Sequence, residues 1–208
     1  MLSVEDIENV LLVGHETRGF EFKGPGDRTD THLMAKVARA ALSLGNLRDG
    51  GYIIIGIDDN EPASLGPGLE DDQLESWTDF DNLSRKLAVY ADPPLGIDTD
   101  GMTLSSGSRV AVIQVHEFAD VPHLCGKAYE DVLRKGALYV RTRTAPETAE
   151  VADSVAMRDL LELAIEKGVR RFVETAARAG LPLGATDVAP PGELDEDRYN
   201  AERERGWE

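Results

Sequence analysis

A segment that is hydrophobic on both alternating faces runs from residue 52 to residue 57, and two carboxylates follow it directly. Four of its six residues are β-branched isoleucines, which is typical of a central strand buried on both sides. If the strand stays extended, its odd-numbered residues Ile53, Ile55 and Ile57 share one face with Asp59. The pattern predicts a sheet organised around this strand, with Asp59 just beyond its end.

Apolar residues at helical spacing predict helices over residues 3–13, 31–44, 79–90, 153–167 and 169–180. Alternating residues predict further strands over 20–23, 96–104, 109–117 and 137–143. The Gly-, Pro- and acid-rich residues 61–77 are expected to form a loop. This order predicts the α+β class: a single mixed-sheet domain with flanking helices over residues 1–180.

Residues 20–23 alternate two aromatic side chains with Glu21 and Lys23. The aromatic pair is expected to anchor the strand on the core, and the acid and the lysine then lie together on its other face. Glu16 has the wrong parity to join them on one continuous strand. A bulge or turn at Gly19 would bring Glu16 back beside Glu21.

Composition narrows the classes of protein that fit. Of 208 residues, 41% are hydrophobic and 29% are charged, which is usual for a soluble globular protein. Cys125 is the single cysteine, no apolar run is long enough to span a bilayer, and the N-terminus lacks the features of a signal peptide, so we expect a cytoplasmic protein. The net charge of −17 argues against a surface coated for non-specific nucleic-acid binding. Residues 181–208, with eight acids against three arginines, predict an acidic, disordered tail.

Glu16, Glu21, Lys23 and Asp59 are the strongest candidates for chemistry. Carboxylates gathered at a sheet edge can hold Mg²⁺ or Mn²⁺ and lower the pKa of a bound water molecule. A nearby lysine can neutralise the charge that develops on a phosphate. The alternative is that these residues are solvated charges on an amphipathic strand and a loop.

The chain resembles the Schlafen core, or AlbA-like, domain family in two blocks. The first is Glu16, four further residues, and then Glu21-Phe22-Lys23; the second is residues 50–59, which read Gly-Gly, four apolar residues, Gly, Ile and two aspartates. Residues 139–141, Tyr-Val-Arg, resemble the closing strand of that family. The sequence departs from the family at residues 43–49, where the usual Ala-Phe-Ala-Asn-Thr is replaced and only Asn46 is kept.

The resemblance implies a metal-dependent endonuclease that cleaves structured RNA, and it favours RNA over DNA as the ligand. In the ribonuclease members an acidic triad acts with a divalent metal, and it maps onto Glu16, Glu21 and Asp59, with Lys23 as the charge neutraliser. The alternative is a non-catalytic module of the same fold that binds nucleic acid or a partner protein. The high acidity favours this alternative, whereas the spacing of the triad favours the enzyme.

Basic residues concentrate around the last predicted strand, at Arg134, Lys135, Arg141 and Arg143. Arg141 and Arg143 share a strand face and, with Lys135, are expected to contact a phosphate backbone. The alternative is that these cations pair with the surplus acids of the chain. The resemblance also implies a homodimer, because Schlafen-type ribonucleases enclose RNA between two related lobes and this chain carries one.

Overall fold

The computed structural model describes residues 2–12, 17–58, 66–142, 147–151 and 154–181. Contacts divide the chain into two units, residues 1–167 and residues 168–208. The predicted domain boundary at residue 180 stays a prediction, and residues 182–208 of the predicted tail lie outside the described residues.

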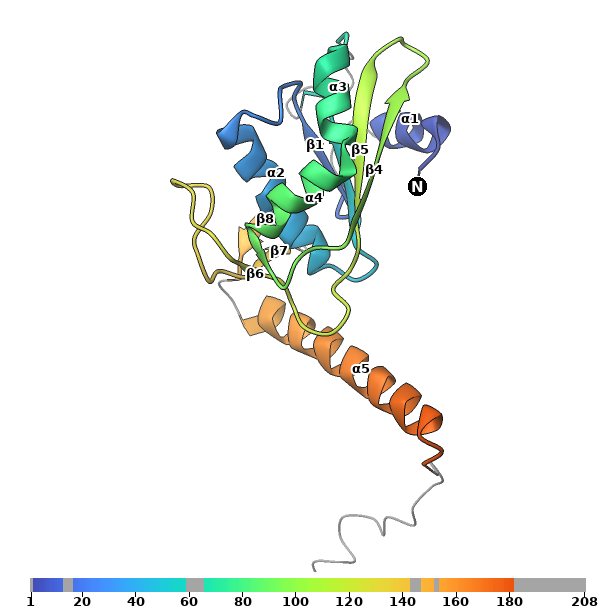
Figure 1. The fold of residues 1–208 in the computed structure, drawn as a ribbon, viewed down its shortest axis with the longest axis vertical. Helices are drawn as coiled ribbons and strands as arrows, with labels where there is room; N and C mark the ends of the chain where they lie inside the picture. Colours follow the sequence, from blue (N-terminus) through green and yellow to red (C-terminus); the bar gives the residue numbers. More distant parts are fainter. Residues whose placement is uncertain (1, 13–16, 59–65, 143–146, 152–153, 182–208) are drawn as a thin grey trace, which may run out of the picture. The chain divides into compact units, whose positions relative to one another are not determined.

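A four-stranded mixed sheet forms the centre of the first unit (Figure 1). Its order is β1 (Phe20–Lys23), β2 (Gly51–Ile55), β5 (Arg109–Val115) and β4 (Ile97–Thr103). β1 and β2 are parallel, and β5 is antiparallel to both of its neighbours. Parallel neighbours need a crossover connection, which α2 (Thr31–Gly45) supplies. The predicted α+β class, with a mixed sheet and flanking helices, is confirmed.

β2 is the strand on which the sheet is built. Ile53, Ile54 and Ile55 have no exposed surface. Ile53 and Ile55 belong to a hydrophobic cluster with α2, whereas Ile54 belongs to a second cluster with Phe22 and α1 (Val4–Leu12). The two helices therefore cover opposite faces of the sheet (Figure 1). The predicted central strand, buried on both sides, is confirmed.

The predicted alternation fails at Ile57. β2 ends at Ile55, and Gly56 adopts a φ of 110°, a conformation open to glycine because it lacks a Cβ atom. The chain changes direction there, so Ile57 joins the cluster that contains Ile54. The expectation that Ile57 shares a face with Ile53 and Ile55 is wrong, and Asp59 lies outside the described residues.

α2 begins where the sequence predicts. The carboxylate of Asp30 caps it by accepting hydrogen bonds from the backbone N–H groups of His32, at 2.8 Å, and Leu33, at 3.2 Å. Alanine, the best helix former, occupies much of its buried side. The N-terminal cap and the hydrophobic spacing agree, which explains why this helix is readable from sequence.

Two helices differ from the prediction. α3 (Asp71–Thr78) lies where a loop was expected and is followed by α4 (Phe80–Ala88). It begins with a capping box between Glu70 and Gln73, and Trp77 is its one buried residue. Its polar sequence therefore lacks the usual hydrophobic stripe. α5 (Ser154–Arg178) is one continuous helix, whereas the hydrophobic spacing predicts two, over residues 153–167 and 169–180; the intervening Gly168 costs about 1 kcal/mol inside a helix and does not have to end it.

Two small sheets complete the first unit. β7 (Tyr139–Arg141) pairs with β8 (Thr148–Glu150), and β3 (Ala91–Asp92) pairs with β6 (Leu124–Cys125). The strand predicted over residues 137–143 is thus present but shorter. Within the described ranges, no helix has the length and apolar character needed to cross a membrane.

Candidate functional site

The carboxyl ends of β1 and β2 meet at one edge of the sheet. The backbone N–H groups of Gly56 and Ile57 donate to the carbonyl oxygen of Lys23 at 2.8 and 3.1 Å. The exit of β2, including the exposed Asp58, therefore lies beside the end of β1. Of the three predicted carboxylates, Glu21 lies within the described residues, whereas Glu16 and Asp59 lie outside them.

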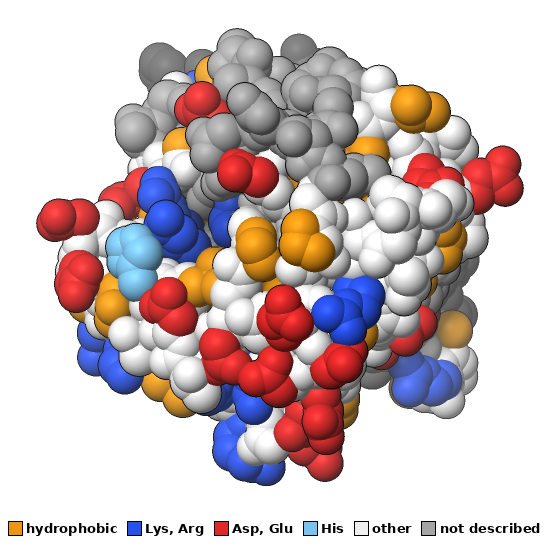
Figure 2. Space-filling model, turned by 90° about the horizontal axis from the view of Figure 1, so that it is seen from above, with side chains coloured by type: hydrophobic (Ala, Val, Ile, Leu, Met, Phe, Trp, Pro, Cys, Tyr) orange, Lys and Arg blue, Asp and Glu red, His pale blue; other side chains and the backbone are white. Residues whose placement is uncertain are grey.

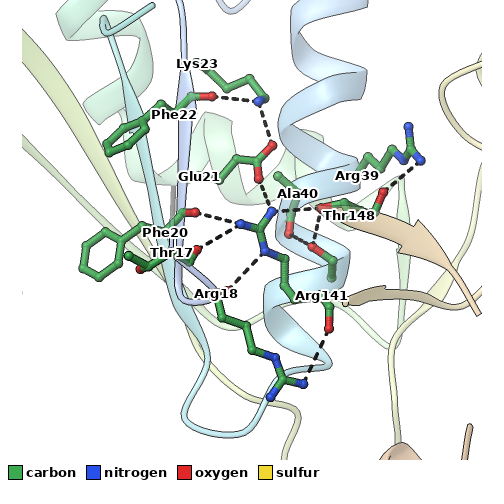
Figure 3. A network of polar contacts seen from close by, with 11 residues as sticks. Thr17, Arg18, Phe20, Glu21, Phe22, Lys23, Arg39, Ala40, Arg141 and Thr148 are labelled. Atoms are coloured by element: carbon green, nitrogen blue, oxygen red, sulfur yellow. Dashed lines mark hydrogen bonds and ion pairs between the residues drawn. The ribbon is translucent and has the colours of Figure 1, made fainter. Parts of the chain in front are cut away.

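Glu21 takes part in a network of ion pairs (Figure 3). Its side chain is largely buried; Oε1 accepts from Lys23 Nζ at 2.7 Å, and Oε2 accepts from Arg141 NH1. Lys23 also donates to the carbonyl oxygen of Phe22 at 2.7 Å. The expectation that Glu21 and Lys23 lie together holds, but both face the interior and not solvent.

Arg141 holds this network in place. Its side chain is 0% exposed, and its guanidinium donates to the backbone carbonyls of Thr17 at 3.1 Å, Arg18 at 3.2 Å and Phe20 at 2.8 Å (Figure 3). It thereby fastens β7 to the segment that leads into β1. As placed, this guanidinium has no surface for an external phosphate, so we revise the expectation that Arg141 contacts a phosphate backbone and assign it an internal role.

The same geometry tests whether Glu21 fits a metal ligand. Each of its two oxygens already accepts from a cationic side chain, and a divalent ion would have to displace Lys23 or Arg141. As placed, Glu21 does not fit a metal ligand, because breaking a buried ion pair costs several kcal/mol, about 3–5. Across the ranges that the structure describes, no three His, Cys, Asp or Glu side chains form a metal-binding group.

The predicted basic residues do not form one cluster in the described part of the chain. Lys135 is exposed in the turn before β7, at the opposite end of that strand from Arg141. Its neighbour Arg134 pairs with Glu150, with 3.1 Å between Nε and Oε2, which matches the alternative that these cations neutralise acids. Arg143 lies outside the described residues.

A hollow of about 560 Å³ lies beside the network, between the end of α2, the β7–β8 pair and the first turns of α5. Two arginines that line this hollow, Arg18 and Arg48, were not among the residues predicted from the sequence. Arg18 is exposed and donates to the carbonyl oxygen of Arg141 at 3.5 Å, and Arg48 pairs with Glu166 at 2.7 Å. Acids also line the hollow, among them Glu150. Nothing in the linear sequence marks Arg18 and Arg48, because it is the fold that brings them together.

Asn46 connects the end of α2 to the strands that carry the network. Its Nδ2 donates to the carbonyl oxygens of His123 at 2.9 Å and Tyr139 at 3.0 Å, and its Oδ1 accepts from the His123 backbone N–H at 2.7 Å. The His123 imidazole is buried as well, and burial lowers its pKa below the ordinary value. Asn46, the residue of this segment that the chain shares with the family, therefore has a structural role.

The surface shown in Figure 2 mixes both signs of charge. Acidic side chains are spread over this face, and basic side chains form small separate groups. A single basic stripe does not cross the described part of this face, as expected for a chain with a net charge of −17. Any contact with nucleic acid has to be local.

Comparison with known families decides the relationship. The family model for Schlafen, AlbA_2 matches residues 16–150, which is more than half of the chain. The chain belongs to this family. The match includes β1, β2 and β7, the strands that position Glu21 and Arg141. The match confirms the resemblance to the Schlafen family that the sequence predicted.

More distant similarity exists to a solved structure, the DIP2311 protein from Corynebacterium diphtheriae. The two chains are 18% identical, with a TM-score of 0.47, and the match covers 71% of this chain and 29% of the other. The chain thus spans less than a third of that protein. No curated protein matches the chain.

Proposed function

We propose that this chain is a nucleic-acid-binding module, with a preference for RNA, that holds its ligand without cleaving it. Its membership of the Schlafen, AlbA_2 family over residues 16–150 carries the proposal of nucleic-acid binding. The preference for RNA follows the ribonuclease members that the sequence resembles. The buried pairing of Glu21 with Lys23 and Arg141 supports binding over hydrolysis.

The charge distribution supports a small interface. Arg18 and Lys135 are exposed cations on the segments that flank the buried network, and Arg143 stays a predicted contact outside the described residues. Few phosphate contacts imply that binding weakens only gradually as salt rises, because the slope of log K against log salt grows with the number of contacted phosphates. The acidic side chains around these cations would repel the phosphates of a long duplex, so an extended binding surface for duplex nucleic acid is disfavoured.

The test is fluorescence anisotropy with a labelled RNA hairpin and a matching DNA duplex, between about 50 and 200 mM salt. The double variant Arg18→Ala/Lys135→Ala should bind more weakly, and the slope of log K against log salt should flatten by about 2, one for each lost phosphate contact. Arg85→Ala is the matched control, because this exposed arginine on α4 bonds to the neighbouring Asn82 at 2.8 Å.

The result separates two conclusions. If neither RNA nor DNA binds at low salt, the proposed function is wrong. If the hairpin binds but the slope of the double variant equals that of wild type, the function stands and the interface lies elsewhere on the molecule.

A metal-dependent endonuclease is the second candidate, with Glu16, Glu21 and Asp59 as Mg²⁺ or Mn²⁺ ligands and Lys23 as charge neutraliser. One observation favours it: the exit of β2 is hydrogen-bonded to Lys23 at the end of β1, so the segment that leads toward the predicted ligand Asp59 begins beside the strand that carries Glu21. It requires Glu21 to exchange Arg141 for the metal. Cleavage of the same hairpin with Mn²⁺ by wild type, abolished in Asp59→Asn, would replace the binding-only proposal with this one.

A further inference from the structure

The face of α5 opposite the buried Leu160 and Leu163 carries a row of exposed hydrophobic side chains. They are Leu161, Ile165, Val169 and Phe172, which we call the α5 stripe, with exposed fractions of 51%, 64%, 58% and 64%. The spacing of four, four and three residues places them next to one another along one side of a helix. Leu160 and Leu163, on the other side, are buried in a hydrophobic cluster of the first unit. The stripe is therefore a second apolar face on the same helix.

An exposed row of large apolar side chains marks an association surface more often than an isolated residue does. We propose that the α5 stripe binds a second copy of this chain, with the two helices antiparallel. The inference goes beyond the proposed function and holds whether or not the chain binds nucleic acid.

Charge along α5 favours the antiparallel pairing. Residues 154–166 hold one arginine and three acids, a net of −2, whereas residues 167–178 hold four basic residues and one acid, a net of +3. Packed helices lie about 8–10 Å apart, which is close to the screening length at physiological salt, about 8 Å. An antiparallel pair sets each acidic half beside a basic half, and a parallel pair sets like charges together.

The stripe is also self-complementary about its middle. A two-fold axis near residue 167 places Leu161 opposite Val173 of the second copy, and Ile165 opposite Val169. Val173 is 44% exposed and adjoins the stripe, so Leu161 and Ile165 each meet an apolar side chain, whereas Phe172 lies opposite Glu162. A patch that meets its own copy in this way forms a closed dimer and not a filament.

The other occupant to consider is the acidic tail of the same chain. Residues 181–208 carry eight acids against three arginines, which suits the basic half of α5 but not its acidic half. A second copy of α5 suits both halves. The observations thus favour the second copy, and the tail becomes an outcome of the test.

Sedimentation velocity on the full chain, from about 1 to about 100 µM, tests the association, because a single helix pair gives a small and weak interface. We expect a monomer that converts to a dimer as concentration rises. Ile165→Glu should raise the dissociation constant about tenfold or more, since it puts a charge at the centre of the pair. Phe80→Glu is the control, because Phe80 is an exposed aromatic residue on α4.

Cysteine cross-linking tests the direction of the helices. In the antiparallel pair, position 161 faces position 173 of the other copy, while the two copies of position 161 are about 18 Å apart along the helix. A disulfide needs Cα atoms within about 7 Å, so a mixture of Leu161→Cys and Val173→Cys proteins should cross-link to each other and not to themselves. Cys125 is buried and does not compete.

Three results would overturn the proposal. The first is a full chain that stays monomeric over the whole concentration range. The second is a dimer that the Ile165→Glu substitution leaves intact. Self-cross-linking of Leu161→Cys would indicate parallel helices. If a chain truncated after Gly180 dimerises and the full chain does not, the tail is the occupant of the stripe.

Discussion

Two regions of this chain reverse the usual distribution of residues, in opposite ways. The network of Glu21, Lys23 and Arg141 places three charges in the interior, whereas the α5 stripe places large apolar side chains in solvent. In most proteins such charges are exposed and such apolar groups are buried.

The difference lies in what each region contacts. In the network, each oxygen of Glu21 accepts from a cation, and the guanidinium of Arg141 is used up by the carboxylate and by backbone carbonyls. Charges satisfied in this way fix the structure and have little left to offer a ligand. The stripe has high exposed fractions along its whole length, so its contacts have to come from another molecule or from the rest of the chain. The network therefore explains the fold, and the stripe points to association.

The largest effect is expected for Arg141→Ala. The substitution leaves Glu21 without its guanidinium partner and frees the backbone carbonyls of Thr17 and Phe20. Removing one member of a buried ion pair costs about 3–5 kcal/mol in the free energy of unfolding, which urea denaturation measures. Arg134→Ala is the control, because Arg134 pairs with Glu150 at the surface and should leave the midpoint nearly unchanged. Equal effects for the two variants would mean that the network does not hold β7 to β1.

Glu21→Gln should have the next largest effect, about 2–3 kcal/mol of destabilisation, because it removes the charge of the carboxylate that accepts from both Lys23 and Arg141. A cluster of metal-ligating carboxylates predicts the opposite sign without metal: removing one acid relieves repulsion and holds or raises stability. Urea denaturation of metal-free protein separates the two interpretations, with Glu16→Gln measured alongside. A stabilised Glu21→Gln protein would count against the network and for the metal site.

Local sequence patterns determine how much of the fold could be predicted from the sequence. β2 and α2 were predictable because hydrophobic period and end signals agree there. α3 was not, because its capping box and a single buried Trp77 replace the usual stripe. α5 was divided wrongly at Gly168 because neighbouring turns carry the helix through a weak position.

The candidate site shows a different limit. The pairing of Glu21 with Lys23 follows from their spacing on one strand. The third partner, Arg141, comes from 120 residues further along the chain. An arginine at the surface and an arginine in the interior look alike in a sequence, so a tertiary contact decides which one Arg141 is.

The smallest effect is expected for Phe172→Ala, and it completes the comparison from the side of the stripe. Phe172 is 64% exposed, so its truncation should change the free energy of unfolding by no more than about 0.5 kcal/mol. Phe22→Ala is the matched control: the same truncation at a fully buried position should cost about 3–5 kcal/mol. Both variants are to be measured at a protein concentration below the dissociation constant of the dimer, since coupled association adds stability by mass action. Repeating Phe172→Ala above that constant should reveal a loss that is absent at low concentration. A loss of similar size at both concentrations would mean that Phe172 is covered within a single chain, and the contrast between a satisfied interior and an unsatisfied helix face would then no longer hold.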